Sequence, residues 1–144
     1  MPSTAGFHPY PLVAFIATTN ASAARRFYRD LLGLRLKSED DWVLVFDANG
    51  TMLRVTLVQE LSPPTHTVLG WAVPDIVAAV RRLGEGRIAL ERHPNLDQDG
   101  LGIWTPPGGA RIAWFKDPDG QTLSLTQVLN GAGSSGPKSR AITP

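Results

Sequence analysis

One order of predicted elements occurs twice along the chain, and this repeat constrains the fold more than any other feature of the sequence. An apolar strand, a helix and three further strands are predicted in residues 12–58, and the same order begins again in residues 66–127 after a Pro-Pro linker. The predicted strands are 12–17, 34–37, 42–46, 51–58, 66–73, 87–90, 111–115 and 122–127, and the predicted helices are 21–32 and 76–83. Two matched β-α-β-β-β modules predict an α+β fold, in which each curved sheet needs the other module or a partner chain to close it.

Individual residues repeat in the same places as the elements. The turn DANG at 47–50 aligns with DPDG at 117–120, and each stands before the last strand of its module. Asn20 aligns with Asp75, and both side chain types can accept a hydrogen bond from the first turn of a helix. Gly33 follows the first predicted helix, where glycine commonly ends helices. Agreement in turn, helix entry and strand order indicates an internal duplication.

The composition excludes several classes of function. The 144 residues carry 14 Lys+Arg and 13 Asp+Glu, whereas a protein that binds a phosphate backbone needs a clear cationic excess. Cysteine is absent, which excludes disulfides, Cys-ligated metals and cysteine nucleophiles.

The sequence shows no pattern of a membrane span or a signal peptide, and its two terminal segments are aperiodic. No apolar run approaches the roughly 18 residues of a membrane span. Residues 1–11 are a Pro-rich arm without a signal-peptide pattern, and residues 128–144, rich in Gly, Ser and Pro, predict a flexible tail. We therefore expect a cytoplasmic protein with no nucleic-acid partner and no membrane partner.

Two segments carry a family resemblance. FYRDLLGL at 27–34 is close to a first-helix ending FYxxxLGF, and FKDPDGQTLSL at 115–125 is close to FxDPDGNxIEL. With the duplicated element order, they make the chain resemble the vicinal-oxygen-chelate superfamily, which contains glyoxalase I, extradiol dioxygenases, fosfomycin-modifying enzymes and bleomycin-resistance proteins. The resemblance implies one domain over residues 12–127, made of module 1 (12–58) and module 2 (66–127). It also implies a cleft of mixed β-sheet and a homodimer.

The resemblance further implies where a divalent metal would be held. Enzymes of the family take metal ligands from the first and last strands of each module, and counting from the motifs gives four positions: Val13, Arg54, Val68 and Ser124. Among these side chains only the neutral serine hydroxyl could bind a divalent cation, and a guanidinium would repel one. His66 lies two residues before Val68, but one histidine does not make a metal site. We therefore expect no metal ion and no cofactor.

Strand alternation predicts which side chains line the cleft. The predicted ligand-binding residues are Phe15, Met52, Arg54, His66, Val68, Trp104, Thr122 and Ser124. Arg54 is the one cation among them and would bind the carboxylate or phosphate of a ligand. Alternatively, Arg54 lies at the rim of the sheet and pairs with an acid of the chain: Asp47, Asp117 or Glu60.

His66 is the best candidate for a general base, because imidazole is the only group in the predicted lining that titrates near neutrality. The alternative is an exposed histidine at a strand start with no chemical role. Neither His8 nor His93 is predicted to face the cleft.

An insertion makes the second module longer than the first. Residues 93–109 are rich in Gly and Pro and carry Trp104. They predict either a flap that lays Trp104 over the cleft or a surface hairpin whose tryptophan packs at a dimer seam.

Three functions are consistent with these features. The first is a metal-free binding protein of the bleomycin-resistance type that sequesters a small aromatic or anionic molecule, and it is favoured by Val13, Val68 and Ser124. The second is an enzyme of the glyoxalase, lyase, isomerase or dioxygenase kind that works without metal or with a metal in a non-standard site, using His66 or Arg54. The third is an accessory or structural module without a ligand.

Overall fold

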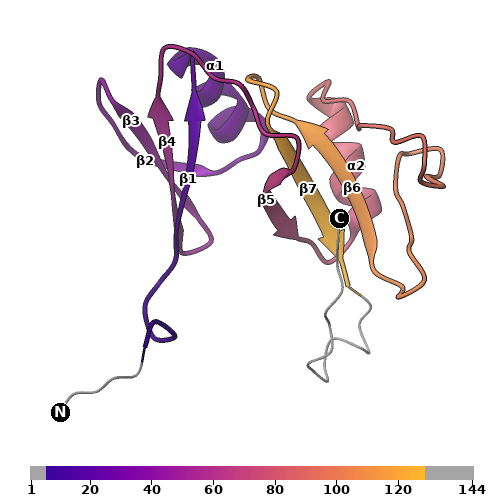
Figure 1. Cartoon of the computed structure of the whole chain (residues 1–144). Coiled ribbons are helices and arrows are strands. Elements are labelled where there is room, and N and C mark those ends of the chain that lie inside the picture. Colours follow the sequence, from indigo (N-terminus) through magenta and orange to yellow (C-terminus); the bar gives the residue numbers. More distant parts are fainter. Residues whose placement is uncertain (1–5, 129–144) are drawn as a thin grey trace. The chain divides into compact units, whose positions relative to one another are not determined.

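The computed structural model describes residues 6–128, which fall into two compact units that meet in sequence at Leu61 and Ser62. Each unit combines a mixed β-sheet with little helix, so the predicted α+β class is confirmed (Figure 1). Residues 1–5 of the predicted arm and residues 129–144 of the predicted tail lie outside the described part of the chain.

Unit 1 (residues 6–61) is built on a four-stranded sheet in the order β1-β4-β3-β2. Its elements are β1 (Val13–Thr18), α1 (Ala21–Arg25), the π-helical segment η1 (Arg26–Leu31), β2 (Arg35–Glu39), β3 (Val43–Ala48) and β4 (Thr51–Leu57). The first strand pairs with the last one in parallel, and the other pairs are antiparallel. This pairing brings the two ends of the module side by side.

The strands of unit 1 alternate between a buried and an open face. Ile16 of β1, Leu53 of β4 and Phe46 of β3 are buried, and the ring of Tyr28 from η1 lies 5.9 Å from that of Phe46. The helical segment therefore covers one face of the sheet, where aromatic packing adds to the burial of apolar area.

The helix predicted over 21–32 is divided between α1 and η1. It begins at Asn20, whose Oδ1 accepts a hydrogen bond from Ala23 N (3.0 Å), and Gly33 follows it with φ +79°. In η1 the backbone is wider, and Leu32 N donates to Phe27 O five residues back. The wider turn buries the adjacent side chains Phe27 and Tyr28 together.

Unit 2 (residues 62–128) has a three-stranded sheet in the order β5-β7-β6, with β5 and β7 parallel. Its elements are β5 (Thr67–Ala72), α2 (Ile76–Glu85), β6 (Arg111–Lys116) and β7 (Thr122–Gln127). The helix α2 contacts β6 and β7 and buries Ile76, Val80 and Leu83 (Figure 1).

The strand predicted over 87–90 is wrong. The helix α2 runs through Gly84 to Glu85, and Arg87 has φ +64°, so the chain leaves the helix too late and too sharply to form a strand. Only Leu90 pairs with β6, opposite Phe115, and Trp104 of the insertion pairs further along the same edge, opposite Ile112. Leu90 and the insertion thus pair with the same edge of β6.

The duplicated cap residues make equivalent hydrogen bonds in the two units, and each turn aspartate accepts hydrogen bonds from backbone N–H groups of its own turn. Asp75 caps α2 as Asn20 caps α1, with Oδ1 accepting from Ala78 N at 3.1 Å. Asp47 Oδ1 accepts from Gly50 N, and Asp117 Oδ1 accepts from Gln121 N. These local bonds explain why the repeat is visible in the sequence.

None of the helices within residues 6–128 has the length and apolar character that crossing a membrane requires.

We predict that Asp75→Ala lowers the free energy of unfolding by about 1 kcal/mol, because α2 loses its N-cap acceptor. Asp75→Asn should retain most of the stability, since its amide oxygen can still accept. Urea unfolding measures the difference, and Asp97→Ala, at an exposed loop position, is the control. Equal stability of Asp75→Ala and Asp97→Ala would contradict the role of the cap.

Candidate functional site

The open face of the unit 1 sheet carries three of the predicted ligand-binding residues. Phe15 on β1 lies directly opposite Arg54 on β4 in the parallel register, and Met52 lies opposite Val13. The Phe15 side chain is 66% exposed, and the guanidinium carbon of Arg54 stands 6.0 Å from its ring centroid. This distance is at the limit of a cation–π contact.

Arg54 makes no ion pair with the acids of unit 1 among the described residues 6–61, so neither Asp47 nor Glu60 partners it. The Asp47 carboxylate accepts a hydrogen bond from its own turn at Gly50 N. The alternative in which Arg54 pairs with an acid at the rim of the sheet is therefore not seen for the two acids of unit 1 within residues 6–61.

The open face of the unit 2 sheet carries Thr122 and Ser124 on β7, but Val68 does not stand beside them as predicted. The register between β5 and β7 shifts between Thr67 and Leu69, which leaves Val68 at a bulge. Gly70 occupies the position opposite Ser124 instead, and a Cβ built there would lie 2.6 Å from the serine Oγ. The extra residue interrupts the alternation, because Thr67 stands opposite Thr122, where strict alternation from Gly70 and Ser124 would place Val68.

The insertion holds Trp104 against the sheet of unit 2 through its backbone. Trp104 N donates to Ile112 O (2.8 Å), and Ile112 N donates back to Trp104 O (2.9 Å). The Trp104 ring stacks on Trp114 with centroids 6.0 Å apart, and His93 meets Trp114 edge-on at 4.9 Å. Trp104 is therefore fixed to the β6 edge of its own unit, and a dimer seam at this place stays a prediction.

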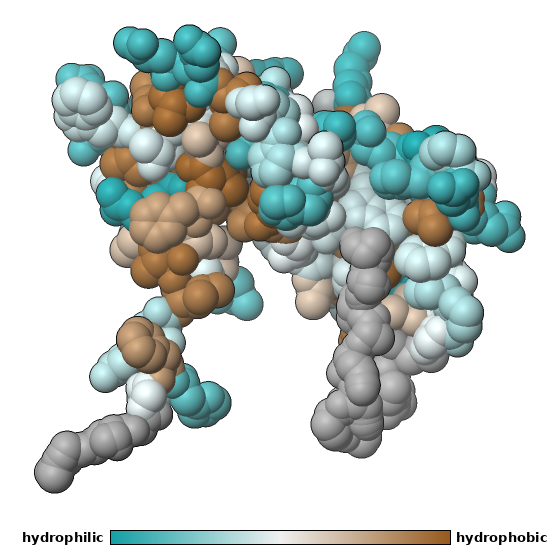
Figure 2. All heavy atoms as spheres, viewed as in Figure 1, coloured by the Kyte–Doolittle hydropathy of each residue, from teal (hydrophilic) through white to brown (hydrophobic). Residues whose placement is uncertain are grey.

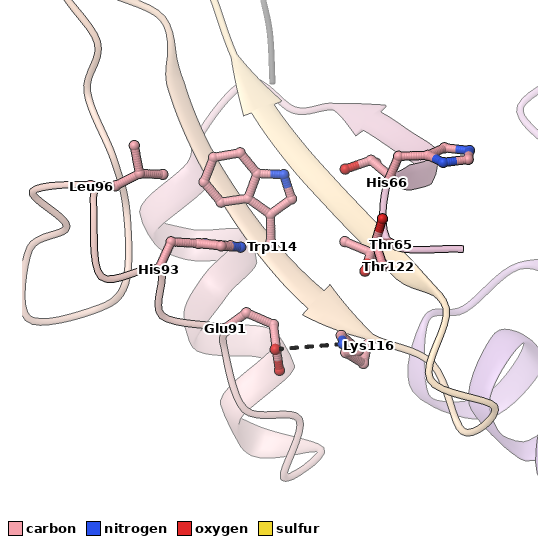
Figure 3. Close-up of a pocket in the computed structure, with 9 residues that line it drawn as sticks. Thr65, His66, Glu91, His93, Leu96, Trp114, Lys116 and Thr122 are labelled. Carbon is pink, nitrogen blue, oxygen red and sulfur yellow. Dashed lines mark ion pairs between the residues drawn. The ribbon is translucent and has the colours of Figure 1, made fainter. Parts of the chain in front are cut away.

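A cavity of about 250 Å³ opens in unit 2 between the start of β5, the end of β6 and the segment after α2 (Figure 3). We call it the His66 pocket. Its lining residues are Thr65, His66, Thr67, Glu91, His93, Leu96, Trp114, Lys116 and Thr122. The structure brings His66 and Thr122 together, both predicted from the sequence, and adds His93, which the sequence analysis placed away from the site.

Two side chains of the insertion anchor the loop that carries the pocket wall. Gln98 Nε2 donates to Glu91 O and Gly102 O, and Gln98 Oε1 accepts from His93 N. Asp99 Oδ1 accepts from Ile103 N and Leu101 N, both at 2.9 Å. These backbone N–H donors, that of Ile103 foremost, hold the pKa of the Asp99 carboxyl below its ordinary value.

The four positions that the resemblance implies for metal ligands carry side chains of mixed character. Val13 and Arg54 lie on the open face of unit 1, and Ser124 lies on that of unit 2. Residues 6–128 contain no group of three or more His, Asp or Glu side chains placed to hold a metal ion.

The comparison with protein families identifies the chain. The model of the Glyoxalase/Bleomycin resistance protein/Dioxygenase superfamily matches residues 11–125, so the chain belongs to this superfamily. The predicted family is therefore confirmed. No curated protein matches the sequence.

Several solved structures share the fold at low sequence identity. A lactoylglutathione lyase from Agrobacterium tumefaciens superimposes with a TM-score of 0.66 at 17% identity, covering 83% of this chain and 95% of that one. A glyoxalase/bleomycin resistance protein/dioxygenase from Nocardioides gives 0.63 at 22% identity, with 86% of each chain covered. TioX from Micromonospora sp. ML1 gives 0.63 at 17% identity, covering 83% of this chain and 98% of that one.

We predict that Asp99→Ala destabilises the protein by roughly 1 kcal/mol at neutral pH, because two backbone donors lose their acceptor. A carboxyl whose pKa is lowered by folding stabilises the folded state above its ordinary pKa, and this stabilisation is lost as the pH falls through the lowered value. The difference between wild type and Asp99→Ala should therefore shrink in acid.

Urea unfolding across a pH series measures this difference, and Asp99→Asn, which keeps a neutral acceptor, is the matched control. A gap between wild type and Asp99→Ala that does not change with pH would show that the carboxylate charge has no part in holding the loop.

Proposed function

We propose that the protein binds a small aromatic or anionic molecule without a metal ion, in the manner of a resistance or sequestration protein. The observation that carries the proposal is the pairing of Arg54 with Phe15 on the open face of unit 1. An exposed aromatic ring beside a guanidinium without an acidic partner offers a stacking surface and a bidentate donor together.

The surroundings of Arg54 support an organic anion as its ligand. Val45 on β3 and Phe15 on β1 flank Arg54 in the register, and Val13 and Met52 form the next pair along the same face. A carboxylate bound among apolar neighbours is less screened by water than one at an exposed rim, so its hydrogen bonds to a guanidinium are stronger. The apolar neighbours would contact the body of the same ligand.

The chemistry of the four family positions supports binding without a metal. Val13 and Val68 have no donor atom, and Arg54 carries a positive charge. Gly70, which stands opposite Ser124, has no side chain either. A neutral serine hydroxyl is a poor ligand by itself, since hard divalent cations prefer carboxylates and transition metals prefer imidazole or thiolate. These residues do not fit the family's metal.

We predict that Arg54→Ala weakens binding of a carboxylate ligand by about 10- to 100-fold, because hydrogen bonds to charged groups contribute about 1.5–3 kcal/mol. A thermal-shift screen of small aromatic acids, phosphates and their neutral analogues first supplies the ligand, since a ligand that binds only the folded state must raise its stability. Calorimetric titration of the variants then measures affinity.

Arg54→Lys keeps the charge but not the fork of donors, so its affinity should lie between those of wild type and Arg54→Ala. Arg35→Ala on β2, an exposed position of the same sheet, is the matched control. Unchanged affinity in Arg54→Ala would remove the basis of the proposal.

We also predict that the purified protein contains no stoichiometric zinc, nickel, manganese or iron, and that a chelator leaves its thermal unfolding temperature unchanged. Elemental analysis and a thermal scan with and without EDTA test this. A stoichiometric metal, or a loss of stability on chelation, would favour an enzyme with a non-standard metal site.

An enzyme that works without metal is the second candidate, and one observation favours it. His66 lines the same pocket as His93, and imidazoles commonly act as general bases. Loss of any turnover in His66→Gln, with ligand affinity retained, is the result that would support this candidate over binding alone.

We further propose a cytoplasmic homodimer. Exposed apolar side chains gather on the segment before β1, and they include Phe7, Tyr10 and Leu12 (Figure 2). Contiguous exposed apolar surface is typical of interaction sites, which supports contact of this segment with a second subunit.

A further inference from the structure

We infer that the His66 pocket binds a single-ring aromatic carboxylate, with the ring against Trp114 and the carboxylate at Lys116. The inference rests on the proposed function only in that both concern binding of a small molecule. All residues of this pocket belong to unit 2, and Arg54 is not among them.

A row of hydrogen-bond donors crosses the sheet at the pocket. The strand register sets Thr67 of β5 opposite Thr122 of β7, and Thr122 opposite Lys116 of β6. Neighbouring strands are about 4.8 Å apart, and residues opposite each other face the same side. Two hydroxyls and an ammonium are thus spaced so that the two oxygens of one carboxylate can reach adjacent members of the row.

These polar groups lack side-chain hydrogen bonds within the described residues, and Lys116 has only a long ion pair with Glu91. Within residues 6–128, the side chains of Thr67, Thr122 and Lys116 make no hydrogen bond, and the imidazoles of His66 and His93 make none either. Thr122 is only 8% exposed, yet no fully buried side-chain polar atom of the described chain lacks a partner, so its hydroxyl must open to the pocket. Polar groups left unpaired at a cavity are the groups that a ligand satisfies.

The acid beside Lys116 is held weakly. Glu91 Oε1 lies 3.9 Å from Lys116 Nζ, beyond hydrogen-bond length, and both side chains are partly exposed (Figure 3). Exposed pairs of this kind contribute little to stability. A ligand carboxylate can therefore take the place of Glu91 at the ammonium at small cost.

The apolar part of the pocket matches one aromatic ring. Trp114 is 5% exposed and forms part of the lining, with Leu96 and the edge-on ring of His93 beside it. A volume of about 250 Å³ lies below the range of roughly 300–1,000 Å³ that holds drug-sized ligands. A nucleotide or a fused polycycle is too large, and an inorganic anion would leave the partly exposed Leu96 side chain uncovered.

A metal ion is the alternative ligand to consider, because histidine and glutamate side chains commonly bind metals. The three side chains His66, His93 and Glu91 line the pocket but are not placed as a ligand group, and no such group occurs in residues 6–128. The ammonium of Lys116 next to Glu91 also opposes a cation. The donors of the pocket therefore favour an anion.

The test uses the three histidines of the chain as reporters, because two line the pocket and His8 does not. In the full-length protein with isotope-labelled histidine, titration with benzoate should shift the imidazole signals of His66 and His93 saturably and leave that of His8 in place. The variants His66→Gln and His93→Gln assign the signals.

Charge variants of opposite sign sharpen the test. Lys116→Met should raise the Kd for benzoate at least tenfold, and Glu91→Gln should lower it, because the ammonium loses its competing carboxylate. Lys37→Met, an exposed lysine of β2, is the matched control and should change nothing. Lys116 is exposed, so its variant should fold, and three dispersed imidazole signals without ligand verify that.

Several results would overturn the inference. Absence of saturable shifts at His66 and His93 would do so, as would equal affinity for benzoate and neutral benzamide, or an unchanged Kd in Lys116→Met. Equal affinity for acetate and benzoate would overturn the aromatic part. The proposed function is tested by titration of the Arg54 variants, whereas this inference is tested by the histidine signals of the unit 2 pocket and by the Lys116 and Glu91 variants, so a failure of either proposal is recognised separately.

Discussion

The parallel pairing of the first strand with the last strand in each module is the constraint on which the rest of the structure depends. It sets Phe15 beside Arg54 in unit 1 and Gly70 beside Ser124 in unit 2, although each pair is far apart in sequence. A parallel pair needs a crossover connection, and the helix with its following strands supplies it in both modules. Backbone hydrogen bonds alone therefore set these residues opposite each other, whatever their side chains.

The two units share the parallel pairing of their first and last strands but differ in the side chains and segments on their open faces. In unit 1 the open face keeps Phe15 exposed beside a guanidinium that has no acidic partner within residues 6–61. In unit 2 the insertion pairs with β6, and Trp104 stacks on Trp114 next to a small pocket. One duplicated scaffold thus presents an exposed aromatic ring beside an arginine in one half and a small cavity in the other.

Much of the fold could be predicted because local chemistry repeats along the chain. The strand at 122–127, the caps at Asn20 and Asp75, and the turn before each last strand follow from short-range patterns, which the structure confirms. Two features of unit 2 were not predicted. Residues 87–90 form no strand because α2 continues past Gly84, and Val68 lies at a bulge where β5 pairs with β7. The bulge has no signal in the sequence, because it depends on the strand that pairs with β5.

The sequence by itself determined the superfamily, the α+β class and the aliphatic, cationic and hydroxyl side chains at the positions implied for metal ligands. Periodicity, caps and turn residues act within a few positions, so they can be read without knowing what packs against them. Only the tertiary structure decided that His93, Glu91 and Lys116 meet His66 in one pocket. Glu91 and His93 lie on an aperiodic segment, Lys116 lies at the end of a strand, and His66 lies at the start of one. Their proximity depends on backbone hydrogen bonds to β6, which no local sequence pattern encodes.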